Sequence, residues 1–162
     1  MFSHDLIVRA ETLLDTARAK GLKIATAESC TGGLISGLLT EVPGSSDVLE
    51  RGFVTYSNDA KEAMLGIPSA LIRQHGAVSE AVARAMAEGA IRNSAAQVSI
   101  AVTGIAGPGG GTEEKPVGLV HIAAARAGEA TLHRECRFGD IGRGAVRLAS
   151  IEAALGMLSS LV

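Results

Sequence analysis

The sequence has few aromatic residues and no excess of either charge. Tryptophan is absent, and the 162 residues include one tyrosine and three phenylalanines. Lysines and arginines number 15, against 17 aspartates and glutamates. Proteins that bind nucleic acid usually cluster basic residues for the phosphates and aromatic rings for the bases. The composition therefore argues against a nucleic-acid partner and predicts a globular core built from Ala, Leu, Ile and Val.

Cysteines and long apolar runs are also scarce. The two cysteines, Cys30 and Cys136, form no CxxC pair, so a disulfide framework is not expected. No window reaches the roughly 18 uninterrupted apolar residues that span a bilayer. Residues 1–20 carry acidic side chains and lack the basic start and apolar run of a signal peptide. These absences predict a cytoplasmic protein without a membrane partner.

The order of helix and strand patterns predicts the fold class. Apolar spacing of 3.6 residues, with caps and glycine or proline stops, indicates helices over residues 3–20, 33–42, 58–65, 79–93 and 141–160. The third of these helices would begin at a cap formed by Asn58 or Asp59. Short β-branched or apolar runs indicate strands over residues 22–27, 51–57, 97–103, 117–125 and 130–138, the last two forming a hairpin. We predict a single α/β domain over residues 1–162, an α/β/α sandwich in which helices cover both faces of a mixed, mostly parallel sheet.

Two loops of small residues follow predicted buried strands, at residues 28–33 and 104–111. In open α/β sheets, ligands bind outside the carboxyl ends of the strands, where backbone N–H groups and helix N-termini favour anions. Neither loop is a GxGxxG fingerprint or a GxxxxGK[ST] P-loop, and any single glycine in them is more simply explained by a tight turn. The length of the 104–111 loop nevertheless favours a binding function for that block. Both loops are suited to a ligand that carries a phosphate.

The candidate nucleophiles are Ser46 and Cys30. Ser46 lies in a turn cluster, and Tyr56 and Lys61 follow it. A serine attacks only after a base takes its proton, and a lysine can serve where burial or a nearby cation lowers its pKa. Only the fold could bring Lys61 to Ser46, whereas Ser57 lies four residues from Lys61 and would share its helix face. Cys30 is the rival, because thiolates are stabilised beside helix starts. Taken alone, a turn serine, a solvated lysine and a buried cysteine explain the same residues.

The acidic and histidine residues add one candidate but no metal site. Glu28 ends a predicted buried strand, so its carboxylate must find a partner there, either by orienting the following loop or by capping a helix. The four histidines, at positions 4, 75, 121 and 133, are scattered without HExxH or Cys/His spacing. We therefore expect no metal ligand among them.

These residues fall in blocks that resemble the CinA C-terminal domain family, whose characterised members are nicotinamide-nucleotide amidases. The matching blocks are TAESCTGG (26–33), GSS (44–46), RGFVTYSN (51–58), Lys61, HGAVS (75–79), TGIAGP (103–108) and KPVG (115–118), with Arg143 in the last predicted helix. The resemblance implies hydrolysis of the carboxamide of nicotinamide mononucleotide to nicotinic acid mononucleotide and ammonia, with no metal or organic cofactor.

The resemblance also assigns roles to single residues. It implies Ser46 as the nucleophile, Lys61 as its general base and Tyr56 as a supporting hydroxyl, with Ser29 as the alternative serine. The implied substrate contacts are Ser29, Thr31, Gly32, Gly33, Thr103, Gly104 and Arg143. Of these, Arg143 at a helix start is suited to clamp the ribose phosphate.

Two further expectations concern organisation and partners. Many family members carry an additional N-terminal nucleotide-hydrolase domain, and this sequence resembles the stand-alone form. Nicotinamide mononucleotide is then the expected small-molecule partner, and a homo-oligomer is compatible with the sequence. The rival interpretation is a non-catalytic nucleotide-binding module linked to competence or the DNA-damage response, which gives the family its name. An ammonia-release assay with nicotinamide mononucleotide separates the two.

Overall fold

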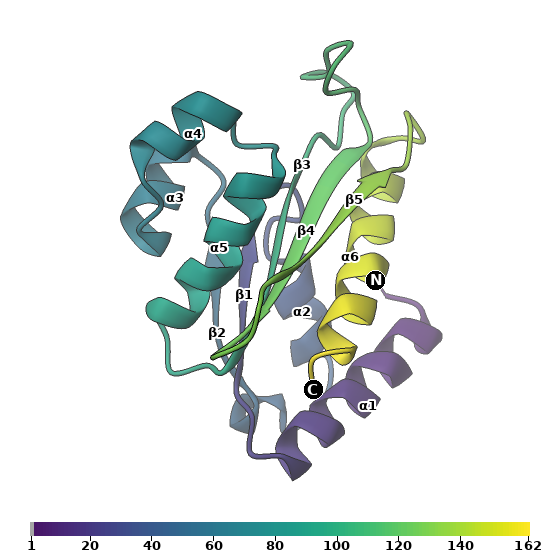
Figure 1. Ribbon diagram of the computed structural model, residues 1–162. Coiled ribbons are helices and arrows are strands. Elements are labelled where there is room, and N and C mark those ends of the chain that lie inside the picture. The colour runs from purple at the N-terminus through teal and green to yellow at the C-terminus, as the bar shows by residue number, and fades with distance from the viewer. Residues whose placement is uncertain (1) are drawn as a thin grey trace.

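A five-stranded sheet forms the centre of the structure (Figure 1). The computed structural model describes residues 2–162. The strands are β1 (Ile24–Glu28), β2 (Leu49–Val54), β3 (Val98–Gly104), β4 (Leu119–Arg126) and β5 (Leu132–Arg137), in the order β2-β1-β3-β4-β5. β1 pairs in parallel with β2 and β3, whereas β4 is antiparallel to β3 and β5. The sheet is therefore mixed, and β2 and β5 are its two outermost strands.

Helices cover both faces of this sheet (Figure 1). On one face lie α1 (His4–Ala19), α2 (Leu34–Thr40) and α6 (Arg143–Ser159), and on the other lie α3 (Asn58–Leu65), α4 (Ser69–His75) and α5 (Glu80–Arg92). A short 3-10 helix, η1 (Ser45–Asp47), precedes β2. This arrangement confirms the predicted α/β fold class. Within residues 2–162, every helix is too short or too polar to cross a membrane.

Serine caps set the starts of three helices. Ser3, Ser57 and Ser79 each accept a hydrogen bond from a backbone N–H in the first turn of α1, α3 and α5. The predicted cap at Asn58 or Asp59 is wrong, because Ser57 takes that role and α3 has already begun at Asn58. The predicted elements also lack α4, whose seven residues are too few for a helical period to show.

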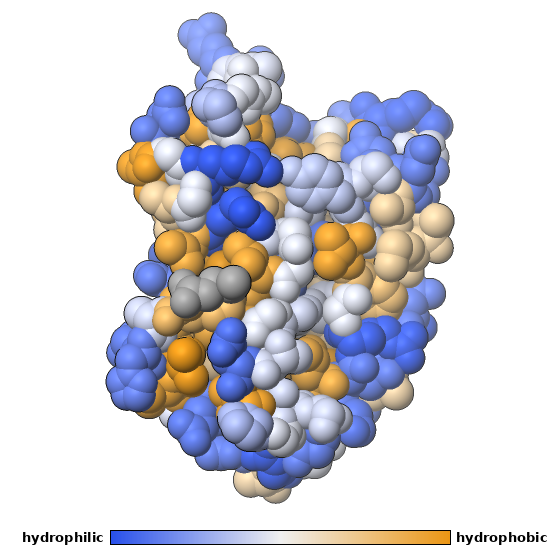
Figure 2. All heavy atoms as spheres, turned by 180° about the vertical axis from the view of Figure 1, so that it is seen from behind, coloured by the Kyte–Doolittle hydropathy of each residue, from blue (hydrophilic) through white to orange (hydrophobic). Residues whose placement is uncertain are grey.

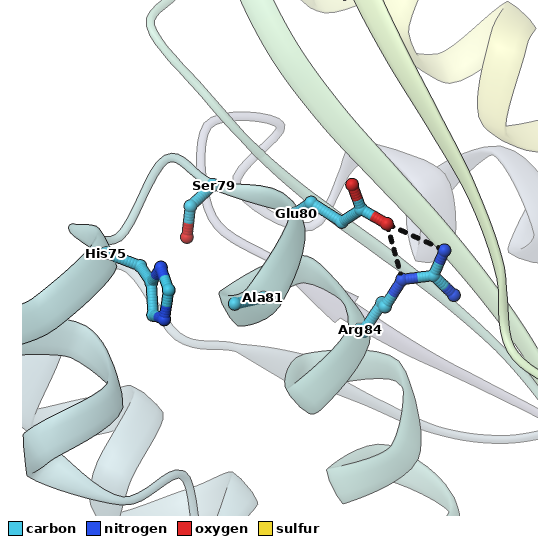
Figure 3. Close-up of a pocket in the computed structure, with 5 residues that line it drawn as sticks. All are labelled: His75, Ser79, Glu80, Ala81 and Arg84. Carbon is cyan, nitrogen blue, oxygen red and sulfur yellow. Dashed lines mark hydrogen bonds and ion pairs between the residues drawn. The ribbon is translucent and has the colours of Figure 1, made fainter.

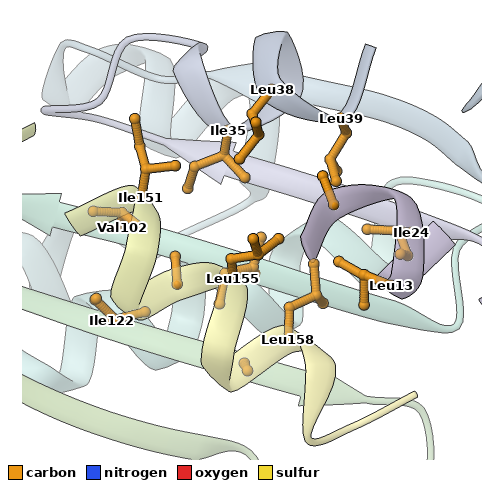
Figure 4. Packing of buried hydrophobic residues seen from close by; sticks show 14 of the residues in the cluster. Leu13, Ile24, Ile35, Leu38, Leu39, Val102, Ile122, Ile151, Leu155 and Leu158 are labelled. Atoms are coloured by element: carbon orange, nitrogen blue, oxygen red, sulfur yellow. The ribbon is translucent and has the colours of Figure 1, made fainter. Parts of the chain in front are cut away.

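Two apolar clusters, one on each face of the sheet, hold the layers together. The larger cluster joins leucines and isoleucines of α1, α2 and α6 to the strands, as Figure 4 shows. Leu38, Ile122 and Leu155 in this cluster are at most 1% exposed, and full burial of such a side chain stabilises the fold by roughly 1.5–3 kcal/mol. The second cluster contains many alanines of β1, β3, β4 and α5, whose small side chains allow the helix to lie close to the sheet.

The strand directions decide which loops meet. Because β1, β2 and β3 are parallel, their carboxyl ends lie at one edge of the sheet, which we call the carboxyl edge. β2 ends at Val54, so the predicted strand over residues 51–57 runs too far, and residues 55–57 instead lead into α3. The residues that follow β1, β2 and β3 are therefore neighbours at the carboxyl edge, although they are far apart in the sequence.

Candidate active site

Residues 29–33, here called the Ser29 turn, carry the chain from the end of β1 into α2. Gly32 and Gly33 have φ angles of 60° and 95°, which residues with a Cβ atom rarely adopt. The N–H of Gly32 donates to the carbonyl oxygen of Ser29 at 3.0 Å and closes the turn. The turn therefore reverses the chain within a few residues and keeps Ser29 at the carboxyl edge.

The amine of Lys61, on α3, contacts the hydroxyl of Ser29. The distance from Lys61 Nζ to Ser29 Oγ is 3.0 Å, and the two residues are 1% and 9% exposed. The same amine donates to the carbonyl oxygens of Thr55 at 2.8 Å and Tyr56 at 3.5 Å. The fold thus pairs a buried lysine with a serine that lies 32 residues before it in the sequence.

The surroundings of Lys61 disfavour its charged form. Burial lowers the pKa of Lys61 below its ordinary value, because an ammonium group loses its hydration when it is buried. Among residues 2–162, no carboxylate forms an ion pair with Lys61. A lysine in such a place is a candidate proton acceptor, because a larger fraction of it is in the neutral amine form than for a solvated lysine.

Glu28 holds the far end of the Ser29 turn. Its fully buried carboxylate accepts hydrogen bonds from the backbone N–H groups of Gly33, Ile35 and Ser36 at 3.1, 3.0 and 2.9 Å. The Ser36 hydroxyl adds a fourth bond at 3.2 Å. The N–H groups at the start of a helix have no partner within the helix, so Glu28 supplies one for α2. This capping is one of the two roles predicted for Glu28, and it also orients the turn.

Several polar groups around Ser29 have no partner. The backbone N–H groups of Cys30 and Thr31 make no hydrogen bond to any of residues 2–162. The buried hydroxyls of Thr31 and Thr55 also lack a partner within that range. Each unpaired buried polar group costs roughly 1–3 kcal/mol, and native structures keep few of them. Their concentration beside Ser29 and Lys61 indicates a place that binds a polar ligand.

Two arginines on the first turns of α6 contact the surrounding loops. The Arg143 guanidinium donates to the Tyr56 hydroxyl at 2.8 Å and to the Gly107 carbonyl at 2.9 Å. One helical turn later, Arg147 donates to the carbonyls of Cys30 and Thr31, both at 3.1 Å. Arg147 is absent from the predicted site residues. Its spacing of four residues from Arg143, which places both on one helix face, was the available signal.

The other predicted substrate contacts lie at the same edge. Thr103, near the end of β3, is buried, and its hydroxyl donates to the carbonyl of Ala77 at 2.9 Å. The end of β3 lies beside the Ser29 turn, because the Ser29 N–H donates to the Val102 carbonyl at 2.9 Å. The predicted residues that the fold gathers at the carboxyl edge are therefore Ser29, Thr31, Gly32, Gly33, Tyr56, Lys61, Thr103, Gly104 and Arg143.

Ser46 lies outside this group. It is exposed in η1, which precedes β2, whereas Tyr56 and Lys61 follow β2. The adjacent Asp47 is bonded to Arg18, with Nε and Oδ2 2.7 Å apart. The structure does not bring Ser46 to Lys61, because β2 lies between them and its two ends lie on opposite sides of the sheet. The alternative serine, Ser29, is the one in contact with the lysine.

Cys30 and the histidines take other roles. Burial raises the pKa of the Cys30 thiol to about 11, so its reactive thiolate form is scarce at neutral pH. His121 and His133 hydrogen-bond to each other, Nδ1 to Nε2, at 2.9 Å, and burial lowers the pKa of both. Across residues 2–162, no three His, Cys, Asp or Glu side chains are grouped so that they could hold a metal ion.

A surface cavity of about 420 Å³ lies between the end of α4 and the start of α5 (Figure 3). His75, Ser79, Glu80, Ala81 and Arg84 line it. Glu80 and Arg84 point toward each other and form an ion pair at 2.7 Å. Neither Ser29 nor Lys61 reaches this cavity. We therefore do not assign the candidate active site to this cavity. The paired side chains of Ser29 and Lys61 at the carboxyl edge identify that site instead.

Apolar side chains also lie on the surface. Seen from behind, the molecule shows several separate apolar patches among polar residues (Figure 2). Next to the carboxyl edge, Val54, Tyr56 and Ile141 are 46%, 60% and 54% exposed. The rim of the candidate site therefore offers apolar as well as polar contacts to a ligand.

Comparison with known proteins gives one family. The CinA C-terminal domain matches residues 8–162. The nicotinamide-nucleotide amidohydrolase PncC of Escherichia coli K12 is 46% identical over 159 residues, which are 98% of this chain and 95% of that protein. A CinA-like protein of Anaeromyxobacter dehalogenans is 53% identical over 141 residues, 86% of this chain. The chain spans only 34% of that relative and 30% and 26% of two others.

Solved structures agree with these sequence matches. A crystal structure of competence/damage inducible protein CihA from Agrobacterium tumefaciens has a TM-score of 0.97 and 52% identity, over 99% of this chain and 98% of that one. A CinA superfamily protein from Escherichia coli has a TM-score of 0.92 and 32% identity, over 100% and 94% of the two chains. The whole α/β arrangement is therefore shared with these proteins.

Proposed function

This chain belongs to the CinA C-terminal domain family, and we propose that it hydrolyses the carboxamide of nicotinamide mononucleotide to nicotinic acid mononucleotide and ammonia. Its 46% identity to a nicotinamide-nucleotide amidohydrolase, over nearly the full length of both chains, makes it an amidohydrolase. The nucleotide substrate and the roles of single residues are our proposal. The observation that carries the proposal is the buried contact between Ser29 and Lys61.

The hydrogen bonds of Lys61 suit a general base. A neutral amine has two N–H donors and one lone pair. The carbonyl oxygens of Thr55 and Tyr56 offer acceptors for the two N–H groups. The lone pair is then free to accept the proton of the Ser29 hydroxyl at 3.0 Å. Burial, which lowers the pKa of Lys61, supports this protonation state before the reaction begins.

The reaction follows in two stages. Ser29 Oγ bonds to the carboxamide carbon, its proton passes to Lys61, and the electron pair of the C=O bond moves onto the oxygen as an oxyanion. When the C–N bond breaks, the Lys61 ammonium gives the proton to the departing nitrogen, which leaves as ammonia. Water then attacks the Ser29 ester and gives a proton to Lys61. Ser29 regains that proton as nicotinic acid mononucleotide leaves. No step uses a metal or an organic cofactor.

The free amides of the Ser29 turn support this chemistry. The N–H groups of Cys30 and Thr31 are unpaired within residues 2–162 and directly follow the nucleophile in the chain. Preorganised N–H groups that face a developing oxyanion are worth roughly 3–4 kcal/mol each, because they need no reorganisation during the reaction. We assign these two amides to the substrate carboxamide oxygen.

The start of α6 suits the phosphate end of the substrate. Arg143 is exposed there, and its contacts to Tyr56 and Gly107 hold the guanidinium between two loops of the carboxyl edge. A helix N-terminus adds unpaired N–H groups and a partial positive charge, both of which favour a phosphate. Thr103 and Gly104, at the end of β3, complete the proposed substrate contacts. Both cysteines are free thiols, which supports action in the reducing cytoplasm.

The test is release of ammonia from nicotinamide mononucleotide by the purified protein. We expect metal-independent turnover that persists in EDTA, is absent in Ser29→Ala, and is weak with free nicotinamide, because the phosphate contributes binding energy away from the reacting amide. Loss of activity in EDTA that zinc restores would contradict the metal-free mechanism. Binding of the nucleotide without any ammonia would favour the rival interpretation of a binding module, which the competence-related name of the Agrobacterium tumefaciens structure suggests.

A further inference from the structure

The side chain of Arg147 is committed to the backbone of the Ser29 turn. Nε donates to the Cys30 carbonyl and Nη2 to the Thr31 carbonyl, both at 3.1 Å. A Cβ atom at Gly32 would come within 3.4 Å of Nη2, so the backbone passes close to the guanidinium. Within residues 2–162, Arg147 forms no ion pair with a carboxylate. Its fixed polar contacts are therefore the two carbonyls.

These bonds fix the direction of one peptide group. The bond between Cys30 and Thr31 is trans, since the single cis bond within residues 2–162 lies at Gly107-Pro108. In a planar trans peptide, the C=O and the following N–H point in opposite directions. Because the Cys30 carbonyl points to Arg147 on α6, the Thr31 N–H points away from α6. That N–H is one of the two unpaired amides of the turn.

Without this clamp the peptide could rotate. The Ser29 turn contains two glycines with positive φ, so its backbone has more conformational freedom than a turn of other residues. Rotation of the Cys30–Thr31 peptide would turn a carbonyl oxygen toward the reacting amide. A carbonyl dipole in that direction repels an oxyanion, whereas an N–H stabilises it. Glu28 fixes the end of the turn at Gly33 but does not contact this peptide.

We propose that Arg147 is a positioning residue, which holds the Cys30–Thr31 peptide so that the Thr31 N–H stabilises the oxyanion formed when Ser29 attacks the substrate. This inference rests on the proposed amide hydrolysis. It gives the two arginines on this helix face different roles. Arg143 contacts Tyr56 and Gly107 at the proposed phosphate end, whereas Arg147 shapes the turn that carries the nucleophile.

The kinetic test uses Arg147→Met and Arg147→Lys. We expect Arg147→Met to lower kcat by about 10- to 100-fold, the scale of a small misplacement of a reacting group, while KM stays within about threefold. The pKa of the rising limb of the pH profile should not move, because that limb belongs to Lys61. Arg147→Lys should recover part of kcat, since an ammonium can reach one carbonyl but lacks the planar fork that binds two.

Arg126→Met is the matched control. The Arg126 guanidinium also donates to a backbone carbonyl, that of Leu161 at 2.7 Å, but it lies at the end of β4 on the opposite edge of the sheet. We expect its kcat to equal that of the wild type. A normal kcat in Arg147→Met would overturn the inference. So would a raised KM at unchanged kcat, because Arg147 would then bind substrate rather than shape the turn.

A second measurement keeps the inference testable if the wild type releases no ammonia, a result that would defeat the proposed function alone. In ¹⁵N-labelled protein, the amide resonances of Thr31 and Gly32 should shift or broaden in Arg147→Met and stay in place in Arg126→Met. Thermal unfolding of both variants checks that they fold. Unchanged Thr31 and Gly32 resonances in folded Arg147→Met would show that the arginine does not hold the peptide, and would overturn the inference.

Discussion

The Ser29 turn and residues 43–47, here called the Ser46 turn, have similar compositions but opposite surroundings. Each combines glycine with serine, and each lies at one end of a strand. Ser29 is 9% exposed and contacts a buried lysine that has no acidic partner within residues 2–162. Ser46 is exposed, and the adjacent Asp47 forms an ion pair with Arg18 at the surface.

The difference shows what a candidate serine nucleophile needs. A serine in a turn is available at both places, but only Ser29 is buried, contacts a candidate base and precedes unpaired backbone amides. In the Ser46 turn, the guanidinium of Arg18 lowers the pKa of the Asp47 carboxyl, so charge is neutralised by ordinary surface pairing. Beside the Ser29 turn, the buried Lys61 forms no ion pair with a carboxylate of residues 2–162. Buried titratable side chains without a charge partner are more frequent at functional sites than in turns that only connect elements.

The sharpest test of the comparison exchanges each serine for alanine. Ser29→Ala should lower kcat by more than about 10³-fold, because the nucleophile is lost. Ser46→Ala should leave kcat and KM unchanged, since that hydroxyl lies at the opposite edge. Ammonia release under saturating nicotinamide mononucleotide measures both. The opposite pattern, with Ser46→Ala inactive and Ser29→Ala active, would reverse our assignment.

Changing the base should have the next largest effect. Lys61→Met should reduce kcat by about 10²- to 10⁴-fold, the usual contribution of a general base. Lys61→Arg should fail nearly as badly, because a guanidinium cannot release its proton. In the wild type, kcat/KM should rise with pH through an apparent pKa below 10.5, since burial lowers the pKa of Lys61. That limb should vanish in Lys61→Met.

Near-normal kcat in Lys61→Arg would contradict the base assignment, because the residue would then supply only positive charge. Glu28 would be the next candidate base. Its carboxylate is already occupied by three N–H groups and the Ser36 hydroxyl, so we expect a change at Glu28 to act through the shape of the turn.

Lys61, beside the Ser29 turn, and Asp47, in the Ser46 turn, should also change the unfolding free energy differently as the pH varies. Because the pKa of Lys61 is lowered in the folded state, the unfolded chain binds more protons between that pKa and 10.5. The unfolding free energy of the wild type should therefore rise with pH in this window, relative to Lys61→Met, by at most about 1.4 kcal/mol per pH unit. Urea unfolding at several alkaline pH values measures the slope. A change at the exposed Lys20, Lys20→Met, is the control.

The absence of a slope would show that Lys61 keeps an ordinary pKa in the folded protein, and a slope of the opposite sign would show that folding raises its pKa. Asp47 gives the contrasting case. Its pKa is lowered by Arg18, so it stabilises the fold above its unfolded pKa and loses that contribution as the pH falls into the acidic range.

The smallest effect is expected for the cysteine next to the nucleophile. Cys30→Ala should change kcat by less than about threefold, and thiol alkylation should be slow, because burial raises the pKa of this thiol to about 11 and a buried thiol is inert. Iodoacetamide labelling followed by mass spectrometry gives the rate, with urea-unfolded protein as the fast reference. Rapid alkylation that abolishes activity in step would make Cys30 the nucleophile instead of Ser29.

Much of the fold could be predicted because its patterns are local. The periods of α1, α5 and α6 and the hairpin of β4 and β5 lie within single segments of the chain, so apolar spacing and turn residues reveal them. The end of β2 was harder to predict, since Thr55 and Tyr56 have strand propensity but leave the sheet to place Lys61. For α4, the sequence offered a proline but too few residues to show a period.

The candidate site was predictable in its parts but not in its pairing. Ser29, Lys61, Thr103 and Arg143 could each be named from motifs, and the rule that ligands bind at the carboxyl ends of parallel strands indicated the correct edge. Deciding between Ser46 and Ser29 as the partner of Lys61 requires the position of η1 relative to β2, which no local pattern contains. The contacts of Arg147 could not be predicted from the sequence, because it binds backbone carbonyls and every residue type has one.

The sequence by itself determined the α/β class, the small-residue turns and the inventory of reactive side chains, because helix period, strand composition and glycine turns depend on neighbouring residues. The tertiary structure decided which of these side chains meet. The parallel pairing of β1 with β2 brings the end of each strand to one edge, so Ser29 contacts Lys61 while Ser46 remains at the other edge. The burial that lowers the pKa of Lys61 also exists only after the layers pack, since desolvation requires the surrounding protein.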